Sequence, residues 1–222
     1  MTGAPASTSG PTGYTGTVAH VFDVSNNMPW YLNPVNTFGG STGATPSWVA
    51  GNGQVLIQRV VLGGTTGTVT FSAIPQVFNN LRLTFITKVD AAFGGANISL
   101  RFNGDTSAIY NCSITSGANS STSNSISTSL NRIQFAGISM GASIANYPGS
   151  NVLDIPGYSN TTFYKTITGT AGAVTTTATD TITRNIAGSW GNTAAITSIT
   201  LLPDTGAGNF IAGSLFYLYG VW

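Results

Sequence analysis

Few side chains in this chain could perform acid–base or nucleophilic chemistry. Its 222 residues include six Asp, one His, one Cys and no Glu. Catalysis by these groups needs partners held close together. His20 and Asp23 lie three apart on a predicted strand and therefore point to opposite faces, and Cys112 stands in a polar strand. We predict no catalytic residue and no enzymatic activity; the alternatives are a dyad of Cys112 and His20, or two Asp meeting in space as in a glycosidase.

Metal-binding patterns are equally sparse. Zinc sites need clustered His and Cys, which this sequence lacks. Asn103 and Asp105, with nearby carbonyls, could supply some of the oxygen ligands that calcium requires. Asn103-Gly104 is also a typical tight turn between two strands, and we favour that interpretation. We therefore predict no metal and no cofactor.

The elements that would have to position such groups are made from an unusual composition. Only 6% of the residues are charged, against roughly 25% in ordinary globular chains, while 41% are hydrophobic. The seven basic residues are scattered singly, so we expect no nucleic-acid partner. Neither a signal peptide nor a membrane-spanning segment is predicted. The formal net charge of +1 weakens self-repulsion and so favours assembly.

The first 17 residues are rich in Gly, Pro, Ser and Thr, and we interpret residues 1–17 as a leader. Within residues 10–18, Gly occurs at every third position, which is the collagen period. Three such triplets are too few for a stable triple helix. The composition favours a flexible polar leader; the alternatives are the tail end of a stalk and a short segment on a trimer axis.

Residues 18–222 have the pattern of one all-β domain. Leu81, Leu83 and Phe85 alternate with polar residues, as expected for a half-buried strand. Ten to twelve such segments recur at intervals of roughly 8–20 residues, separated by turn residues. This spacing predicts a jelly-roll-like antiparallel β-sandwich. Residues 113–129, almost all Ser, Thr, Asn and Gly, are expected to form a loop or an exposed edge hairpin.

Two sets of residues are candidates for contacts. Trp30, Tyr31 and Trp48 stand in a long stretch, residues 25–53, that looks irregular; there they could stack on sugars or cap a core or subunit interface. The last strand is apolar on both faces over residues 215–219. One face must meet something other than the core, either another layer of the chain or another subunit. We predict a subunit interface that includes Phe216, Leu218 and Trp222, with cover by the same chain as the alternative.

Three segments carry a resemblance to a known class of proteins. They are the leader sequence Gly13-Tyr14-Thr15-Gly16, the stretch Leu100–Asp105 followed by Tyr110, and the ending Asn209–Gly220. They resemble fibre and surface proteins of tailed bacteriophages, notably marine and cyanobacterial ones. Beyond the leader, the resemblance covers about residues 70–222.

This resemblance implies a function on the virion surface. It implies a homotrimer that decorates or stabilises a capsid or forms a fibre head, with major capsid or tail proteins as partners. The alternative is a tail-fibre module that binds host surface glycans, through Trp30, Tyr31 and Trp48.

Overall fold

The computed structural model describes residues 20–23, 28–33, 47–50, 53–92, 95–118, 121–141, 146–174, 181–204, 206 and 208–222. Every regular element in these ranges is a β-strand. No helix in the described ranges could cross a membrane. The chain divides into two compact units, Met1–Val55 together with Trp222, and Leu56–Val221. The predicted leader, residues 1–17, lies outside the described residues.

The N-terminal unit contains a three-stranded antiparallel sheet. Its strands are β1 (His20–Asp23), β2 (Met28–Asn33) and β3 (Ser47–Ala50), in the order β1-β2-β3. The prediction that residues 25–53 are irregular was therefore wrong for β2 and β3. Both strands are short and separated by a long connection, so neither shows enough alternation to be recognised, although their aromatic and β-branched residues favour extended backbone.

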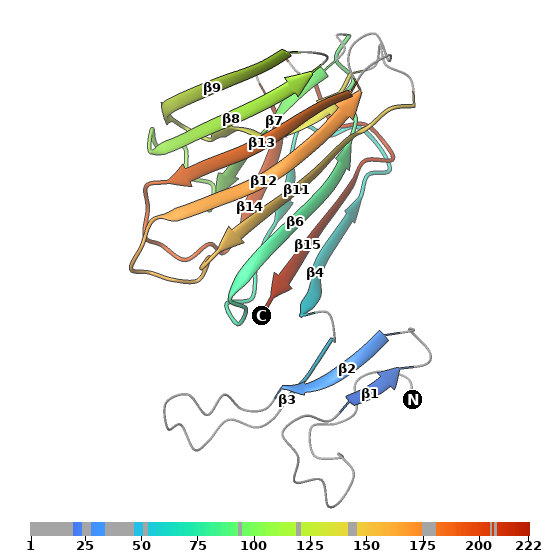
Figure 1. Cartoon of the computed structure of the whole chain (residues 1–222), viewed down its shortest axis with the longest axis vertical. Helices are drawn as coiled ribbons and strands as arrows, with labels where there is room; N and C mark the ends of the chain where they lie inside the picture. Colours follow the sequence, from blue (N-terminus) through green and yellow to red (C-terminus); the bar gives the residue numbers. More distant parts are fainter. Residues whose placement is uncertain are drawn as a thin grey trace, which may run out of the picture. The chain divides into compact units, whose positions relative to one another are not determined.

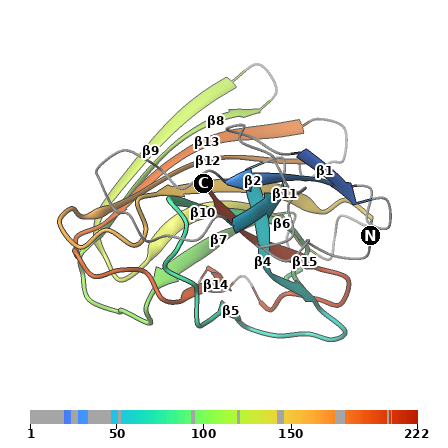
Figure 2. The ribbon, with the colours of Figure 1, turned by 90° about the horizontal axis from the view of Figure 1, so that it is seen from below.

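Twelve strands form the sandwich, within the expected ten to twelve, and the predicted all-β class is confirmed. They lie in an eight-stranded sheet and a four-stranded sheet, which face each other as two layers (Figure 2). The strands are β4 (Gln54–Val61), β5 (Val69–Phe71), β6 (Asn80–Thr87), β7 (Gly95–Phe102), β8 (Tyr110–Ala118), β9 (Ser121–Leu130), β10 (Ile133–Met140), β11 (Gly149–Pro156), β12 (Lys165–Val174), β13 (Thr181–Trp190), β14 (Ile199–Pro203) and β15 (Leu215–Val221).

Eight of these strands have the pairing of a jelly roll. One half of the long sheet has the order β4-β15-β6-β11, and the short sheet has the order β5-β14-β7-β10. Numbered one to eight along the chain, these orders are 1-8-3-6 and 2-7-4-5, the arrangement of two interleaved Greek keys. The jelly-roll prediction is thus confirmed by the strand order.

Two inserted hairpins widen one layer of this jelly roll. The hairpin β8–β9 is inserted between β7 and β10, and β12–β13 is inserted between β11 and β14. Both join the long sheet, which continues from β11 as β12-β13-β8-β9 (Figure 1). The predicted exposed edge hairpin is therefore present, with β9 at the sheet edge. Asn103 and Gly104, both with positive φ, form the predicted turn before β8.

The core lies between the two sheets. Strand β10 belongs to the short sheet, yet its residues Ile138 and Met140 are almost fully buried, because it packs across β11, β12 and β13 of the long sheet. The inserted hairpins thereby contribute to the same core as the jelly roll. Trp190 of β13 packs against Phe102 of β7 with ring centroids 5.6 Å apart. Burial of such rings dominates the stability of a core.

The last strand corrects the predicted subunit interface. Phe216 and Leu218 have no exposed surface, and Phe216 packs against Phe210 at 5.1 Å between ring centroids. Both side chains therefore belong to the core of their own chain, and the prediction chose the wrong face of β15. Tyr217 and Tyr219 occupy the opposite, partly exposed face.

Candidate interaction surface

The outward face of β15 is apolar and incompletely covered. Its residues Leu215, Tyr217, Tyr219 and Val221 are each partly exposed, whereas the alternate residues are buried. The two tyrosine rings lie 6.3 Å apart between centroids, at 17° to each other. On the neighbouring strand β6, Ile86 pairs with Leu215 and is 40% exposed.

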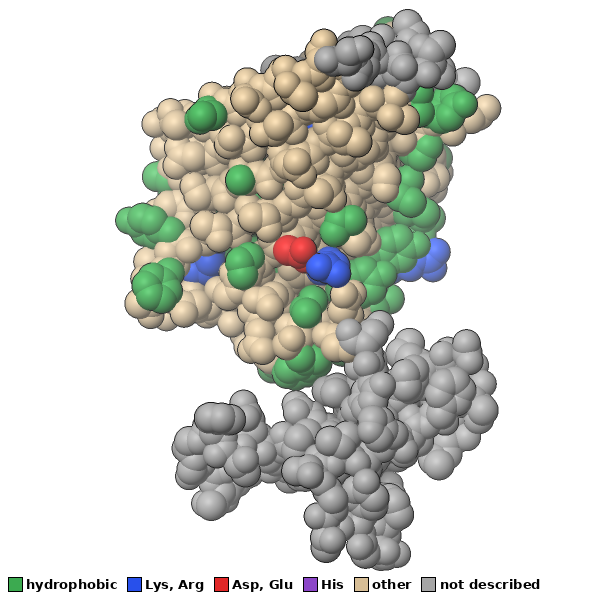
Figure 3. Space-filling view, in the orientation of Figure 1, with side chains coloured by type: hydrophobic (Ala, Val, Ile, Leu, Met, Phe, Trp, Pro, Cys, Tyr) green, Lys and Arg blue, Asp and Glu red, His purple; other side chains and the backbone are tan. Residues whose placement is uncertain are grey.

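Strand β4 extends this surface on the other side of β15. The guanidinium of Arg59 lies 5.8 Å from the centre of the Tyr217 ring, which places Arg59 on the outward face. Val61, two residues further on, shares that face and is 49% exposed. Hydrophobic side chains accordingly gather along the β4–β15 margin in Figure 3. We call this set of residues the apolar patch: Val61, Ile86, Leu215, Tyr217, Tyr219 and Val221.

One ion pair borders the apolar patch. Arg82 of β6 pairs with Tyr219 in the sheet, and its Nε donates to Asp154 Oδ1 of β11 at 2.7 Å while its second nitrogen donates to Oδ2 at 3.0 Å. The hydrogen bonds to this carboxylate raise the pKa of Arg82. Both side chains are about two-fifths exposed, so the pair adds little to stability but fixes two charges beside the patch.

Beyond Asp154 the outward face becomes polar without becoming charged. Shallow hollows of about 390 Å³ and about 270 Å³ open on it. The hydroxyl and amide side chains on this half hydrate the surface, and they have less conformational freedom than long charged side chains. The outward residues of this half include Thr166, Thr168 and Thr170 of β12, Thr183, Asn185 and Ser189 of β13, and Asn111, Ser113 and Thr115 of β8.

The four aspartates whose side chains are described all hold other parts of the chain. Besides the Arg82–Asp154 pair, Asp204 accepts from Arg132 at 2.6 Å and from Gln134 at 2.9 Å. Asp90 accepts from the backbone N–H of Asn209 at 2.7 Å, a bond that lowers the pKa of its carboxyl group. Within the described residues no group of three His, Cys, Asp or Glu side chains could hold a metal ion.

Asp105 explains the stretch from Leu100 to Tyr110 in structural terms. Its Oδ1 accepts the N–H of Ser107 at 2.8 Å, and its Oδ2 accepts the indole N–H of Trp190 at 2.8 Å. These bonds, chiefly the one from Ser107, lower the pKa of the Asp105 carboxyl group. The Tyr110 hydroxyl donates to the carbonyl of Phe102 at 3.3 Å, and burial raises its pKa to about 12. The turn is therefore fixed onto β13.

Asn103 fixes the same turn to a second segment. Its side-chain oxygen accepts the N–H groups of Thr197 at 2.8 Å and Ser198 at 3.1 Å, and its amide donates to the carbonyl of Ala195 at 2.8 Å. The side-chain oxygens of Asn103 and Asp105, considered above as calcium ligands, thus accept hydrogen bonds from protein donors. This arrangement favours the turn over the calcium alternative.

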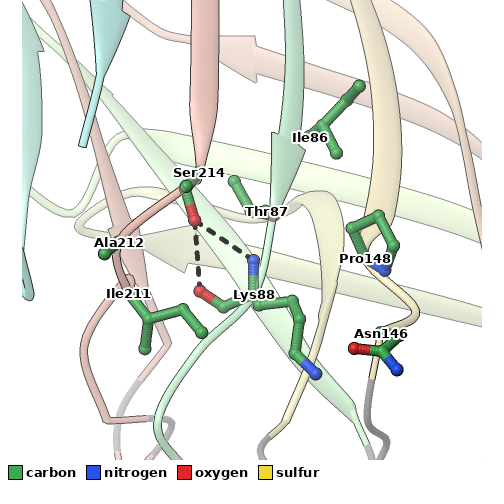
Figure 4. A pocket seen from close by; sticks show the side chains of 9 residues that line it. Ile86, Thr87, Lys88, Asn146, Pro148, Ile211, Ala212 and Ser214 are labelled. Carbon is green, nitrogen blue, oxygen red and sulfur yellow. Dashed lines mark hydrogen bonds between the residues drawn. The ribbon is translucent and has the colours of Figure 1, made fainter. Parts of the chain in front are cut away.

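A small hollow of about 190 Å³ opens at the end of β6 (Figure 4). The Ser214 hydroxyl lies in its wall, where it accepts a hydrogen bond from the Lys88 N–H at 3.3 Å and donates one to the Lys88 carbonyl at 3.4 Å. Ile86, Pro148 and Ile211 supply apolar parts of the lining. We see no pair of acid and base groups among these residues, and we assign the hollow no chemical role.

Sequence reasoning missed one buried cation, Lys165, and one partly buried cation, Arg184. Lys165 of β12 is 1% exposed, and its Nζ donates to the carbonyls of Phe163 and Thr193 at 2.9 and 3.0 Å. Arg184 of β13 donates to the Asn97 side chain at 2.7 Å. Burial lowers the pKa of both cations. Each sits at an inward position of a Thr- and Ser-rich strand, so only the strand's alternation could have indicated it.

The remaining predicted contact residues fall in different places. Trp30 and Tyr31 lie in β2, and Trp48 lies in β3, where it pairs with Leu32. They stand in strands and not in loops, and their side chains lie outside what the structure describes. Trp222, the third predicted interface residue, is 40% exposed. Cys112 is buried on the inward face of β8.

Comparisons with protein-family models, with curated proteins and with solved structures found nothing that matches this chain.

Proposed function

We propose that this chain is a non-enzymatic structural protein of a phage virion surface, which assembles as a homotrimer through the apolar patch. The observation that carries this proposal is the partly exposed aromatic face of β15. Tyrosine is enriched where proteins associate, because its ring is apolar and its hydroxyl tolerates water. A face with Tyr217 and Tyr219 side by side, beside Ile86, is better suited to a protein partner than to solvent.

The partner we propose is a further copy of the chain, together with capsid or tail proteins at the assembly site. The low net charge favours self-association, because copies repel one another weakly. The uncharged polar half of the long sheet would remain in contact with water. The virion location rests on the resemblance of the leader, the Leu100–Asp105 stretch and the chain ending to phage surface proteins.

The mass in solution tests the assembly. At micromolar concentration the chain of 22.8 kDa is expected to sediment in multiples of three chains. Changing Tyr217→Ser and Tyr219→Ser together is expected to abolish the threefold assembly while leaving the unfolding transition cooperative. The matched control is Thr168→Ser with Thr170→Ser, on the same face of the same sheet, which should keep the wild-type mass. A wild-type monomer, or a double tyrosine variant that still forms trimers, would refute the proposal.

Antibody labelling tests the location. Phage particles that contain this chain are expected to bind an antibody raised against the sandwich at repeated positions on the capsid or at the fibre tips. Intact particles that contain the chain but bind no antibody would contradict a surface role. Binding to a glycan array that the double tyrosine variant retains would instead favour the receptor-binding alternative.

A further inference from the structure

The long sheet ends at β9 in an edge that lacks the usual protection against pairing. An edge strand presents unpaired N–H and C=O groups, and proteins normally block it with charges, proline, shortness or a covering segment. Over its ten residues β9 contains no charged residue and no proline. Most of its side chains are exposed, and Ile126 is 75% exposed.

The other three edges of the two sandwich sheets are protected in recognisable ways. Strand β4 carries Arg59, and β5 is only three residues long. Strand β10 is buried over residues 136–140, with Ser139 fully inaccessible, because it packs against the inner face of the long sheet. Among the four edges of the two sandwich sheets, β9 is therefore the one best suited to accept a further strand.

A bulge limits the part of β9 that can pair regularly. Cys112 pairs with Ser127 and Tyr110 with Leu130, so two β9 residues lie opposite one β8 residue between these pairs. Ser129 has a positive φ of 56° at this point. The regular ladder therefore covers residues 121–127, whose central residue is Asn124.

This regular segment is complementary to a second copy of itself. If two β9 strands pair antiparallel about a twofold axis through Asn124, each Asn124 lies opposite its counterpart, where the two amides can hydrogen-bond. Thr122 then lies opposite Ile126 of the other copy, and the branched threonine side chain covers the exposed isoleucine. The inward-facing positions pair serine with serine: Ser121 with Ser127, and Ser123 with Ser125.

We propose that β9 is a second self-association site, at which two copies join their eight-stranded sheets edge to edge in this register. The apolar patch and β9 lie towards opposite edges of the long sheet, so both contacts can form in the same chain. Pairing through β9 would link proposed trimers into larger multiples of three. The β9 contact is independent of the trimer and can be tested separately.

Cysteine crosslinking tests the register directly. Under oxidising conditions Asn124→Cys is expected to give a disulfide-linked dimer, because the two new thiols lie opposite each other. Thr122→Cys is the matched control, also exposed and on the same face of β9, but in this register its copy lies about 13 Å away along the strand, beyond disulfide reach. Equal crosslinking of both variants, or none for Asn124→Cys, would overturn the proposal. The second result is also expected if another segment of the same chain covers β9.

Charge substitutions test the same contact without a covalent bond. Asn124→Lys and Asn124→Asp are each expected to abolish pairing, because like charges would face each other across the axis. Each variant alone should sediment as the isolated trimer, and a mixture of the two should regain the larger multiples. No regain in the mixture would contradict the register. In the Tyr217→Ser, Tyr219→Ser background, β9 pairing should still give dimers, so a failure of the trimer is distinguishable from a failure at β9.

Discussion

The two halves of the long sheet are built alike on the inside and differently on the outside. Strands β4, β15, β6 and β11 belong to the jelly roll, whereas β12, β13, β8 and β9 come from inserted hairpins. Each half contributes fully buried inward rings to the core: Phe216 of β15 and Trp190 of β13 have 0% and 1% of their surface exposed. Outward residues change from tyrosine and isoleucine to threonine, serine and asparagine. The fold therefore requires apolar residues on the inner face of both halves. The residue types on the outer face instead depend on whether that surface contacts a protein partner or water.

Removing a buried ring from either half is expected to have the largest effect. Phe216→Ala and Trp190→Ala should each lower the free energy of unfolding by about 3–5 kcal/mol, since each leaves a large cavity. Urea denaturation measures both, with Phe163→Ala, 71% exposed, as a nearly neutral control. If the inserted hairpins were an appendage outside the common core, Trp190→Ala would cost far less than Phe216→Ala, and the comparison of the halves would fail.

Glycines on β12 test the packing where the two halves of the long sheet meet, between β11 and β12. A Cβ on Gly169 would lie 2.3 Å from the backbone oxygen of Val152 on β11, whereas a Cβ on Gly172 would meet nothing nearer than 3.9 Å. Gly169→Ala is expected to cost about 1–3 kcal/mol by forcing β11 and β12 apart. Gly172→Ala should be neutral or slightly stabilising, because it restricts the unfolded chain. Equal changes in the free energy of unfolding of the two variants, measured by urea denaturation, would mean that β11 and β12 are loosely packed against each other.

The sequence alone predicted the β-sandwich, but it could not predict where the inserted hairpins join the long sheet. Alternation in Leu81, Leu83 and Phe85 is a local property, and it gave the strand class directly. The position of β8–β9 beyond β13 depends on pairings such as Arg184 with Ser116, which are 68 residues apart and leave no local signal. The spacing of strands and turns predicted a jelly-roll-like sandwich but did not predict the order of its strands.

The prediction of which face of β15 forms the subunit interface was wrong for a different reason. A strand that is apolar on both sides gives no hydrophobic signal for which side is inward. A second signal was present, because Tyr217 and Tyr219 share one face and their hydroxyls prefer contact with water or a polar partner. That signal favours Phe216 and Leu218 as the inward pair, as the structure has them.

Acid should weaken the attachment of the β7–β8 turn to the inserted half. Hydrogen bonds hold the pKa of Asp105 below its value in the unfolded chain, so the carboxylate stabilises the fold above about pH 4 and this contribution is lost as the pH falls through the lowered pKa. In Asp105→Asn this pH-dependent contribution should vanish, leaving a flatter stability profile between about pH 5 and 2. Unfolding measured across that range checks the prediction; an unchanged slope would contradict it.

Outward substitutions should have the smallest effects on stability and separate the halves most clearly by function. Thr170→Val is expected to change the free energy of unfolding by no more than about 0.5 kcal/mol. Tyr217→Thr should cost about 0.5–1 kcal/mol, the value of an exposed contact between a cation and a ring, because Arg59 loses its partner.

The association of the two outward variants should nevertheless differ. Of the two substituted residues, Tyr217 belongs to the apolar patch and Thr170 does not. Tyr217→Thr is therefore expected to weaken the threefold assembly measured by sedimentation, whereas Thr170→Val should match the wild-type chain. If Thr170→Val weakened assembly as much as Tyr217→Thr, the contact would extend over the polar half. The change from aromatic to hydroxyl side chains across the sheet would then no longer mark the boundary between a buried surface and a wet one.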